Sequence, residues 1–517
     1  MPSFVRQVQP PLAFIPTAYS PWVMRVVHWL LPVFLRVRVR PWLPAGISRI
    51  EVKNVERLVD LYRQLEARKA RFLMAPRHVE VDDPLMGVYL CSRAVVRAAR
   101  AQGIRLNQPV HTHFLYERGM TLWAGRFVGW LLSRMGGVPI RRGRRPDWVG
   151  LKAARRVMVT GTMPMAVAPE GATNGHSERM GPLEPGVAQL GFWCAEDLAR
   201  RESDAPEDIE KAALEATESV YILPIGIQYR YEQPNWTKLA EVLSQLEAKS
   251  GLREINAGSS LALAPTAEKD CYLRILRLGE HLVGVLETFY DRFYPLSTAQ
   301  KQALADTVAS QESLSKESSL SKESSSSKEI ELKTAASDCS ELDCSARLQL
   351  LRIRALQAAE SFFNLSGKGT AVDRCRRIEE ASWQAIYRED LPALSELSAM
   401  ERGLADWMAE EASLRELHMR LVESVVAVDS AYLRAKPSFE RCAEMTLLMF
   451  DVIGRLGARK VPGRPRLGKR WVTMTVQPPI AVSPRLAEYQ QNRRAGRQAV
   501  AALTEEIRVA LEETIER

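Results

Sequence analysis

The residues best suited to chemistry are a histidine and an aspartate five positions apart, His78 and Asp83, in the stretch RHVEVDDP. A carboxylate that hydrogen-bonds one imidazole nitrogen fixes the tautomer and stabilises the imidazolium, which leaves the other nitrogen free to take a proton from a substrate. On one helix the two side chains would point apart, because five steps of about 100° leave them about 140° out of phase. The pair can act together only if the backbone turns between them.

The flanking sequence indicates such a turn. RFLMAP (71–76) predicts a short buried strand, and the stretch from Pro84 to Gly103 has the pattern of a helix. Proline suits the first turn of a helix, so Asp83 is expected at the N-cap. His78 would then lie in the loop and could fold back over the helix start. The alternative interpretation is that Asp83 is only a cap and His78 only a polar loop residue.

The elements that must position this pair alternate along the chain. Strand patterns recur at 109–116, 137–142, 163–171 and 220–229, with helical patterns between them. This alternation predicts an α/β fold with a mixed, mostly parallel sheet flanked by helices. A last strand pattern at 469–482 follows a long helical region, and we expect it to return to the first sheet.

The same patterns predict four parts. Residues 1–50 form an N-terminal segment, 51–235 the α/β core, 236–455 a helical insertion, and 456–517 a closing strand and helix that return to the core. Within the insertion, about 310–345 is rich in Ser, Lys and Glu and contains the near-repeat SKESS twice. Such a composition cannot bury apolar surface, so a flexible loop is expected there.

Composition limits the partners. The 517 residues carry a net charge of +9, which suggests an anionic partner such as lipid headgroups, nucleotide phosphates, an acidic carrier protein or nucleic acid. No zinc-finger, leucine-zipper or RNA-recognition signature is present, so nucleic acid is disfavoured. The seven cysteines form no CxxC pair or zinc-binding spacing, and no signal peptide is recognised, which favours a reducing, cytosolic environment.

The N-terminal stretch SPWVMRVVHWLLPVFLRVRVRPWL (20–43) is apolar but uncharged only from Val26 to Leu35. A membrane span needs about 20 apolar residues, so this stretch is not expected to cross a bilayer. Its aromatic residues and flanking arginines suit a helix that lies in the membrane interface. This predicts peripheral or monotopic association with the cytoplasmic side of a membrane. The alternative is an ordinary amphipathic helix packed on the core.

Three more stretches accompany the histidine and aspartate. GGVPIRR ends in Arg142, VAPEG puts Glu170 and Gly171 just past a strand, and ILPIG places Pro224 inside a later strand. Ligands of open α/β sheets bind beyond the strand ends. Taken in order, these stretches resemble the four motif blocks of the glycerolipid acyltransferases, the 1-acylglycerol-3-phosphate acyltransferase family. The resemblance covers roughly 50–230 and 468–517.

The resemblance implies an enzyme of phospholipid biosynthesis. It would move a fatty acyl group from an acyl-CoA or acyl-carrier-protein thioester to the free hydroxyl of 1-acylglycerol 3-phosphate, a lysophospholipid acceptor (lysophosphatidate). His78 would be the general base and Asp83 would orient it, with no covalent enzyme intermediate, no metal and no resident cofactor.

The remaining block residues would bind substrate by the same resemblance. Arg142 and Glu170 would contact the acceptor, with Glu170 accepting from a hydroxyl or holding the arginine. Gly171 would let the backbone approach closely, and Pro224 would help to shape the acyl or thioester pocket.

The chain departs from the family pattern in places that bear on the acceptor. Arg77 stands where an asparagine usually precedes the histidine, and Ala172-Thr173 replaces the usual Thr-Arg, which removes one cation. Two further interpretations are therefore open. The first is an acyltransferase for glycerol 3-phosphate, another lysolipid or a neutral alcohol, and the second is a non-catalytic lipid-binding scaffold.

Overall fold

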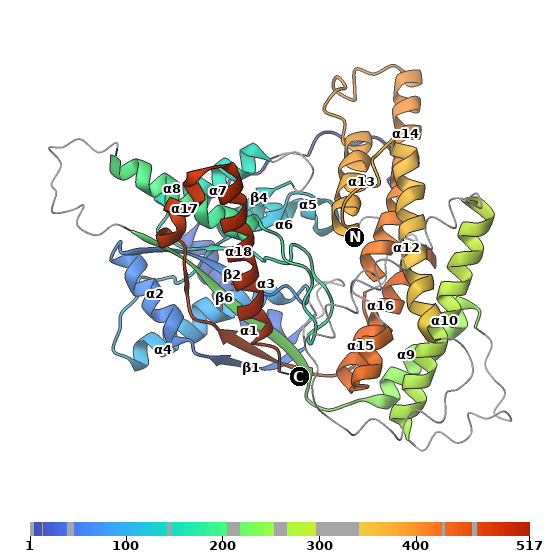
Figure 1. The fold of residues 1–517 in the computed structure, drawn as a ribbon, viewed down its shortest axis with the longest axis horizontal. Coiled ribbons are helices and arrows are strands. Elements are labelled where there is room, and N and C mark those ends of the chain that lie inside the picture. The colour runs from blue at the N-terminus through green and yellow to red at the C-terminus, as the bar shows by residue number, and fades with distance from the viewer. Residues whose placement is uncertain are drawn as a thin grey trace. The chain divides into compact units, whose positions relative to one another are not determined.

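The computed structural model describes residues 5–12, 14–38, 46–141, 147–203, 218–252, 266–295, 341–425, 430–457 and 463–516. The chain divides into two compact units (Figure 1). The α/β unit comprises residues 1–2, 12–235 and 460–517, and the helical unit comprises 3–11 and 236–459.

The α/β unit is built on one eight-stranded sheet in the described part of the chain, with the order β1-β7-β6-β2-β5-β3-β4 and with β8 paired to β6. The strands are β1 (Ile47–Lys53), β2 (Ala70–Pro76), β3 (His113–Glu117), β4 (Gly137–Ile140), β5 (Met165–Ala166), β6 (Ser219–Tyr231), β7 (Arg470–Val476) and β8 (Ile480–Ala481). Only β7 and β8 run antiparallel to their neighbour β6, and the remaining pairs are parallel. The predicted α/β fold with a mixed, mostly parallel sheet is therefore confirmed.

The central strand is β6, which pairs with β2 on one side and β7 on the other. Its sequence SVYILPIGIQYRY is an almost continuous apolar run, and most of its residues are buried. That pattern is typical of a strand covered on both faces. The closing strand β7 lies between β1 and β6, so residues from the end of the chain complete the sheet.

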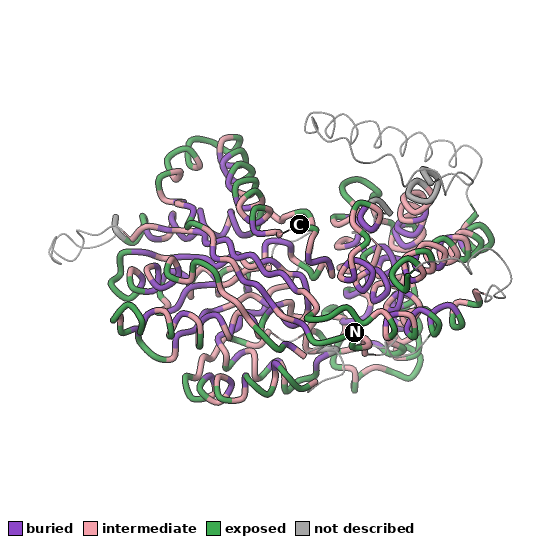
Figure 2. Tube along the Cα trace, turned by 90° about the horizontal axis from the view of Figure 1, so that it is seen from below, coloured by how far each residue is buried: buried purple, intermediate pink, exposed green. Residues whose placement is uncertain are grey.

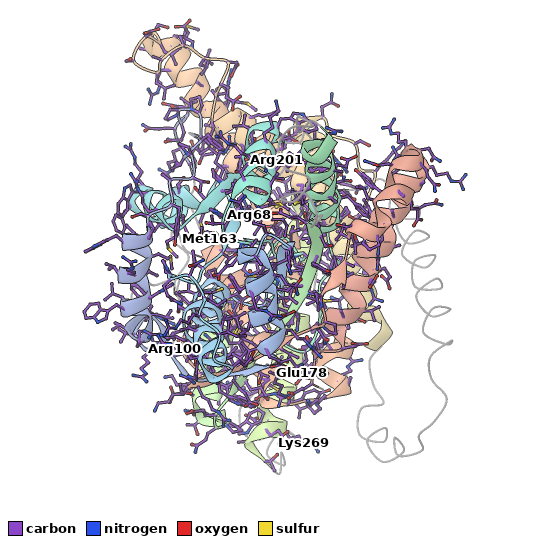
Figure 3. The ribbon with its side chains drawn as sticks, turned by 90° about the vertical axis from the view of Figure 1, so that its left-hand side faces the viewer. Arg68, Arg100, Met163, Glu178, Arg201 and Lys269 are labelled. Carbon is purple, nitrogen blue, oxygen red and sulfur yellow. The ribbon has the colours of Figure 1, made fainter. Side chains whose placement is uncertain are left out.

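Helices cover both faces of the sheet (Figure 1). The helices of this unit are α1 (Pro21–Arg36), α2 (Glu56–Glu66), α3 (Asp83–Tyr89), a π-helical turn (Leu90–Val95), α4 (Val96–Ala101), α5 (Met120–Ala124), α6 (Arg126–Arg134), α7 (Trp148–Thr160), α8 (Gly186–Ser203), a 3-10 turn (Ser483–Arg485), α17 (Leu486–Gln491) and α18 (Arg493–Glu512). Buried residues of α1 to α4 form one apolar core with the sheet, and those of α7, α8 and α18 form a second core on the other face. Figure 2 shows buried residues running along the strands between these layers, and Figure 3 shows the side chains that fill the space.

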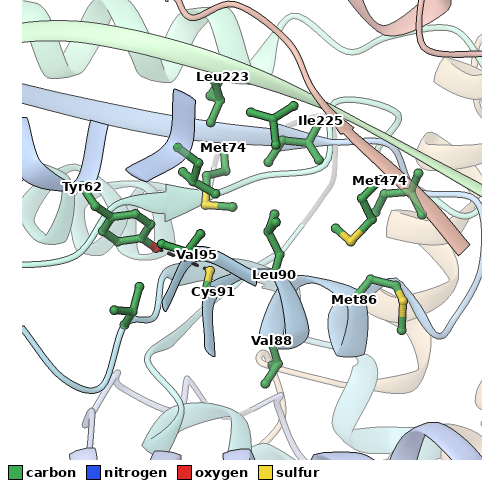
Figure 4. Packing of buried hydrophobic residues seen from close by; sticks show 14 of the residues in the cluster. Tyr62, Met74, Met86, Val88, Leu90, Cys91, Val95, Leu223, Ile225 and Met474 are labelled. Atoms are coloured by element: carbon green, nitrogen blue, oxygen red, sulfur yellow. Dashed lines mark hydrogen bonds between the residues drawn. The ribbon is translucent and has the colours of Figure 1, made fainter. Parts of the chain in front are cut away.

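Helix α3 is fixed to the sheet by apolar side chains on one of its faces. Figure 4 shows Met86 beside Met474 of β7, and Leu90 in the π-helical turn beneath Met74 and Ile225, whereas Val88 points away from the strands. Met86 is fully buried in this core. Because α3 begins at Asp83, this packing determines where the Asp83 backbone lies relative to β6 and β7.

The strand β1 was not predicted from the sequence. ISRIEVK alternates poorly between polar and apolar residues, and its only fully buried side chain is Ile47. It is the edge strand beyond β7, where one side of the ladder is open, so little apolar patterning is needed. Strand β3 begins at His113, four residues later than the start of its predicted segment at 109.

The N-terminal helix α1 uses one face to pack on the α/β unit. Met24, Val27, Leu31 and Leu35 are buried in the apolar core, and the Ser20 side chain caps the helix start. The other face leaves Trp22 and other apolar side chains exposed. Among the described residues, no helix combines the length and the apolar character needed to cross a membrane.

The helical unit is formed by α9 (Trp236–Ser250), α10 (Ala267–Phe293), α12 (Glu341–Phe363), α13 (Ala371–Ile386), α14 (Ala399–Val425), α15 (Ser430–Ala435) and α16 (Phe439–Gly457). A core around Tyr290, Leu356 and Met419 joins α10, α12 and α14. Most of the loop predicted at about 310–345 lies outside the described residues, and α12 already begins at Glu341.

Candidate active site

The predicted site residues follow strands that lie side by side. Strands β2, β5, β3 and β4 are adjacent and parallel, so their carboxyl ends share one edge of the sheet. The chain that leaves β2 carries His78, and the chain that leaves β5 carries Glu170. The chain that leaves β4 continues to Arg141, and Arg142 lies outside the described residues. The topology therefore brings two of the predicted blocks to the edge at which α/β proteins bind ligands.

His78 and Asp83 are in direct contact. The Nδ1 atom of His78 lies 3.0 Å from Oδ2 of Asp83, a hydrogen-bonding distance. The His78 side chain is 27% exposed, and the Asp83 side chain only 6%. No described residue makes a hydrogen bond to Nε2 of His78. The ring is therefore held by its Nδ1 side, and its other nitrogen is left for an incoming group.

The turn that makes this contact differs in one respect from the prediction. Asp82 occupies the N-cap position of α3, whereas Asp83 is the first helical residue, so the predicted cap is one residue off. The Asp83 carboxylate instead accepts the backbone N–H of Glu80 at 3.0 Å through Oδ2. A carboxylate in the first turn is also favoured by the helix dipole. Two donors therefore converge on one oxygen of Asp83, which fixes its orientation toward His78.

Tyr229 of β6 is a third partner of Asp83 that the sequence did not reveal. Its hydroxyl donates to Oδ1 of Asp83 at 2.6 Å, and both groups are buried. The two residues are 146 positions apart in the chain, so no local pattern could have paired them. The only available signal was that a tyrosine stands near the end of a long apolar strand.

Glu170 joins the His78 segment to the loop that follows β5. Its Oε1 accepts the backbone N–H of His78 at 3.1 Å. Its Oε2 accepts from the Asn174 side chain at 2.6 Å and from the Gly181 backbone at 3.0 Å. Glu170 is 8% exposed, so these protein donors surround a nearly buried carboxylate. The geometry makes Glu170 a support for the turn that carries His78.

Arg77 holds the same loop from the other side. It is 1% exposed, and its guanidinium donates to the carbonyl oxygens of Ser177 at 2.8 Å and Arg179 at 2.7 Å. Its Nε lies 3.6 Å from Oε1 of Glu170. The residue that departs from the family pattern next to His78 is thus used to fasten the loop 174–181 to the strand end.

Charged groups from the closing strand complete the surroundings of the turn. Arg470 forms a buried ion pair with Asp82, and its guanidinium lies 5.0 Å from the centre of the Tyr229 ring. Burial opposes the charge of Arg470, but Glu80 and Asp82 outweigh this effect and raise the pKa of Arg470 above its ordinary value. Burial also raises the pKa of Glu80, an effect that Arg464 and Arg470 oppose.

The structure gives the backbone conformation of the two remaining residues, Gly171 and Pro224, and the predicted role of each in substrate binding stays a prediction. Gly171 has a φ of +71°, a left-handed conformation that glycine adopts without steric cost. Pro224 is buried within β6, opposite Ala75 of β2, and its carbonyl accepts the backbone N–H of Gln477 at 3.0 Å. A contribution of Pro224 to an acyl pocket stays a prediction.

Two buried histidines near β3 bind backbone carbonyls. A ring nitrogen of His111 lies 2.8 Å from the carbonyl oxygen of Met135, and one of His113 lies 2.9 Å from that of Gly136. In the described part of the chain, no group of three or more His, Cys, Asp or Glu residues could hold a metal ion.

The arrangement can perform general acid–base chemistry at one atom, Nε2 of His78. Asp83 holds the tautomer in which Nδ1 carries the proton, and it would stabilise the imidazolium formed when Nε2 accepts a second proton. Comparisons with known protein families, with curated proteins and with solved structures found no match for this chain.

Proposed function

We propose that this protein is an acyltransferase that moves a fatty acyl group from an acyl-CoA or acyl-carrier-protein thioester to the free hydroxyl of 1-acylglycerol 3-phosphate. The proposal is supported chiefly by the contact of 3.0 Å between Nδ1 of His78 and Oδ2 of Asp83, with Nε2 turned to no described partner. The order of the four sequence blocks, which resembles that of the glycerolipid acyltransferases, supports the substrate class.

The chemistry follows from the position of the free nitrogen. Nε2 of His78 removes the proton of the acceptor hydroxyl as its oxygen attacks the thioester carbonyl carbon, and a tetrahedral intermediate forms. The C–S bond then breaks, and the imidazolium returns the proton to the departing thiolate. The products are an ester and a free thiol, and Asp83 stabilises the transient positive charge on the ring. A general base of this kind contributes roughly 10²–10⁴-fold to the rate.

The acceptor is proposed to approach from the edge of the sheet where the chain leaves β2, β4 and β5. Arg142 remains the proposed phosphate ligand, since a guanidinium offers paired N–H donors to phosphate oxygens. Glu170 is proposed to act indirectly, because its oxygens already accept from the protein. This choice replaces direct acceptor binding by Glu170 with support of the turn that carries His78.

A peripheral membrane contact is proposed for α1 and α6. Trp22 and Trp29 on α1 are 71% and 76% exposed, and exposed Phe127 and Trp130 on α6 stack with ring centres 5.5 Å apart. The two helices adjoin, since the backbone N–H of Ser20 donates to the carbonyl of Arg134. Exposed aromatic side chains of this kind favour the headgroup region of a bilayer. Such a contact would let the site take a lipid acceptor from the membrane.

The direct test is an acceptor panel with the purified full chain. Acyl-CoA and acyl-carrier protein serve as donors against 1-acylglycerol 3-phosphate, glycerol 3-phosphate, lysophosphatidylcholine and a neutral long-chain alcohol. We expect transfer to 1-acylglycerol 3-phosphate to exceed transfer to each other acceptor by at least about tenfold. Transfer to another acceptor instead would retain the chemistry and replace the substrate.

The non-catalytic alternative predicts a different result in the same panel. A lipid-binding scaffold would bind vesicles but transfer no acyl group from either donor to any acceptor. Absence of transfer with both donors, from protein with a cooperative unfolding transition, would therefore overturn the proposed enzyme.

A further inference from the structure

The strand β6 extends well past the end of its neighbour β2. The last paired residues of the two strands are Pro76 and Ile225, and β6 continues to Tyr231. Tyr229 is therefore four residues beyond the end of the pairing, beside the turn that carries His78 and Asp83. Alternate residues of β6 face one side of the sheet, and Tyr229 belongs to the same apolar core as α3. The register of β6 thus brings a tyrosine hydroxyl beneath the start of α3.

We propose that the Tyr229 hydroxyl is a positioning group of the active site, which holds the Asp83 carboxylate and moderates the negative charge that Asp83 presents to His78. The inference rests on the proposed function, because it assigns a partner to the proposed general base. Tyr229 touches neither substrate nor His78 in this account, and it acts only through Asp83.

The direction of the hydrogen bond follows from the chemistry of the pair. An ionised carboxylate can only accept, so the phenol donates its proton to Oδ1 of Asp83 at 2.6 Å. Burial, followed by the charges of Asp83 and Asp82, raises the pKa of Tyr229 well above its ordinary value, so the hydroxyl keeps its proton. Tyr229 is therefore a permanent donor over the working pH range.

The Tyr229 ring is itself held in place from β7. The Arg470 guanidinium lies over the ring at 5.0 Å, and Arg470 also forms the buried ion pair with Asp82. A cation over the face of a phenol is attracted to the ring, which adds rigidity at this position. The closing strand, far from His78 in the chain, thereby helps to aim the hydroxyl at Asp83.

Other charged groups also lie around His78 and Asp83, and they come from the neighbouring elements. They are Glu80 and Asp82 on the turn itself, Arg77 at the end of β2, Glu170 after β5 and Arg470 on β7. None of these five groups is altered when the Tyr229 hydroxyl alone is removed. The effect of that hydroxyl can therefore be measured against a constant electrostatic background.

The physical consequence concerns how strongly Asp83 stabilises a protonated His78. A hydroxyl that donates to Oδ1 takes up part of the carboxylate charge, so less remains to stabilise the imidazolium. Without the hydroxyl, Oδ2 still accepts from Glu80 N–H and His78, so the contact between Asp83 and His78 persists. Removing the hydroxyl therefore makes the ring easier to protonate, and the midpoint of its titration moves to higher pH.

The test is Tyr229→Phe in the full-length protein, with the His78 ring followed by NMR of ¹³Cε1-labelled histidine and assigned with His78→Gln. We expect the titration midpoint to rise by about 0.5 to 1 unit. A hydrogen bond to a charged group contributes roughly 1.5–3 kcal/mol, and only part of the energy of the bond between Tyr229 and Asp83 affects the protonation of His78. The acidic limb of kcat/KM should move by the same amount, with KM for both substrates changed less than about twofold.

The matched control is Tyr62→Phe. Tyr62 is another buried tyrosine of the same apolar core, but its hydroxyl donates to the His111 carbonyl at 2.9 Å and does not reach Asp83. Tyr62→Phe removes the same hydroxyl oxygen from a similarly buried position. We expect the titration midpoint of His78 to stay within about 0.2 unit in this control. A larger change would show that loss of a buried hydroxyl alters the midpoint through packing in general. A second control repeats Tyr229→Phe in an Asp83→Asn background, where the neutral amide should abolish the shift.

The outcomes separate this inference from the proposed function. An unchanged or lowered midpoint in Tyr229→Phe, or an equal shift in the Asp83→Asn background, would overturn the inference. Because the titration is read on the resting protein, absence of acyl transfer with the expected shift would overturn the proposed function alone.

Should Tyr229→Phe fail to fold, 3-fluorotyrosine at position 229 keeps the ring and makes the hydroxyl a stronger donor. The midpoint must then move to lower pH, and any other result contradicts the inference.

Discussion

The Nδ1 atom of His78 lies 3.0 Å from Oδ2 of Asp83, although the two residues are five positions apart in the chain. The turn from β2 into α3 makes this contact possible, and three features fix it. Glu80 N–H and the Tyr229 hydroxyl bind the two oxygens of Asp83, and Glu170 binds the backbone of His78. The imidazole therefore has a fixed orientation in the protein by itself.

Loss of the charge on Asp83 should reduce the rate of catalysis strongly. Asp83→Asn removes the group that stabilises the imidazolium, and we expect kcat for acyl transfer to fall about 10²–10⁴-fold with KM changed less than about threefold. Steady-state kinetics with a saturating thioester donor measure both. A loss of less than about fivefold in kcat would show that Asp83 has no catalytic role.

The neighbouring aspartate provides a contrast. Asp82→Asn breaks the buried ion pair with Arg470, so this buried cation loses one of its carboxylate partners, while Glu80 remains 3.8 Å away. We expect a loss of about 3 kcal/mol in the free energy of unfolding, because the buried charge of Arg470 is then less well compensated. Urea unfolding measures this, and the rate per folded molecule at low temperature should stay within about threefold of the wild type. A thousandfold loss of that rate would mean that Asp82, and not Asp83, serves the histidine.

Glu170 offers a test between support and substrate binding. Glu170→Ala removes an acceptor from the His78 backbone, the Asn174 side chain and the Gly181 backbone. We expect a loss of about 2–3 kcal/mol in stability and faster proteolysis of the loop 174–181, because buried donors lose their acceptor. An unchanged stability with KM for the acceptor raised more than tenfold would favour direct acceptor binding by Glu170.

The stability of the protein should fall below neutral pH because of buried histidines. Burial lowers the pKa of His111 to about 3, and burial followed by Arg93 lowers that of His28 to about 4. The unfolded chain binds a proton at each residue as the pH falls below about 6.5, whereas the folded chain does not. The free energy of unfolding is therefore unaffected by these two histidines above about pH 6.5. It falls as the pH is lowered toward 4, by at most about 1.4 kcal/mol per pH unit for His111.

Urea unfolding at several pH values from 7 to 5 checks this dependence. His111→Gln keeps a side-chain donor for the carbonyl of Met135. It should reduce the slope of the unfolding free energy against pH by the equivalent of about one bound proton. A slope identical to that of the wild type, or stability that increases as the pH is lowered, would contradict the assignment.

The exposed tryptophans of α1 should govern binding to membranes. Trp22 and Trp29 are more than two-thirds exposed, so Trp22→Ser with Trp29→Ser removes apolar surface without disturbing the core. We expect binding to vesicles of phosphatidylglycerol and phosphatidylcholine to weaken about tenfold or more, as judged by sedimentation, since each aromatic ring loses interfacial burial. Trp407→Ser on α14, also exposed, is the matched control. An equal loss in this control would show that the effect is not specific to α1.

The sequence allowed prediction of the parts of the site that are local. The spacing of His78 and Asp83 with Pro84 between a strand and a helix is a pattern over a few residues, so the turn could be foreseen. Its detail could not, because Asp82 and Asp83 are equally suited to cap a helix and only the backbone path selects Asp82.

The distant partners of the site were beyond sequence reasoning. Tyr229 contacts Asp83 because β6 extends beyond the end of β2. Arg470 contacts Asp82 because β7 pairs with β6 in one particular register. Register depends on the packing of whole strands, which no single residue reveals. The edge strand β1 was missed for a related reason, since ISRIEVK carries charges on a half-exposed ladder and lacks the apolar pattern of its neighbours.

The most direct test of the account is the single-turnover rate of acyl transfer from a thioester to 1-acylglycerol 3-phosphate, measured for the wild type and for His78→Gln. His281→Gln in the helical unit, whose ring nitrogen lies near the carbonyl of Ser250, is the matched control. We expect His78→Gln to lose at least about 10³-fold with an unchanged unfolding transition, and the control to lose less than twofold. Equal rates for the wild type and His78→Gln would contradict the central claim that His78 is the general base.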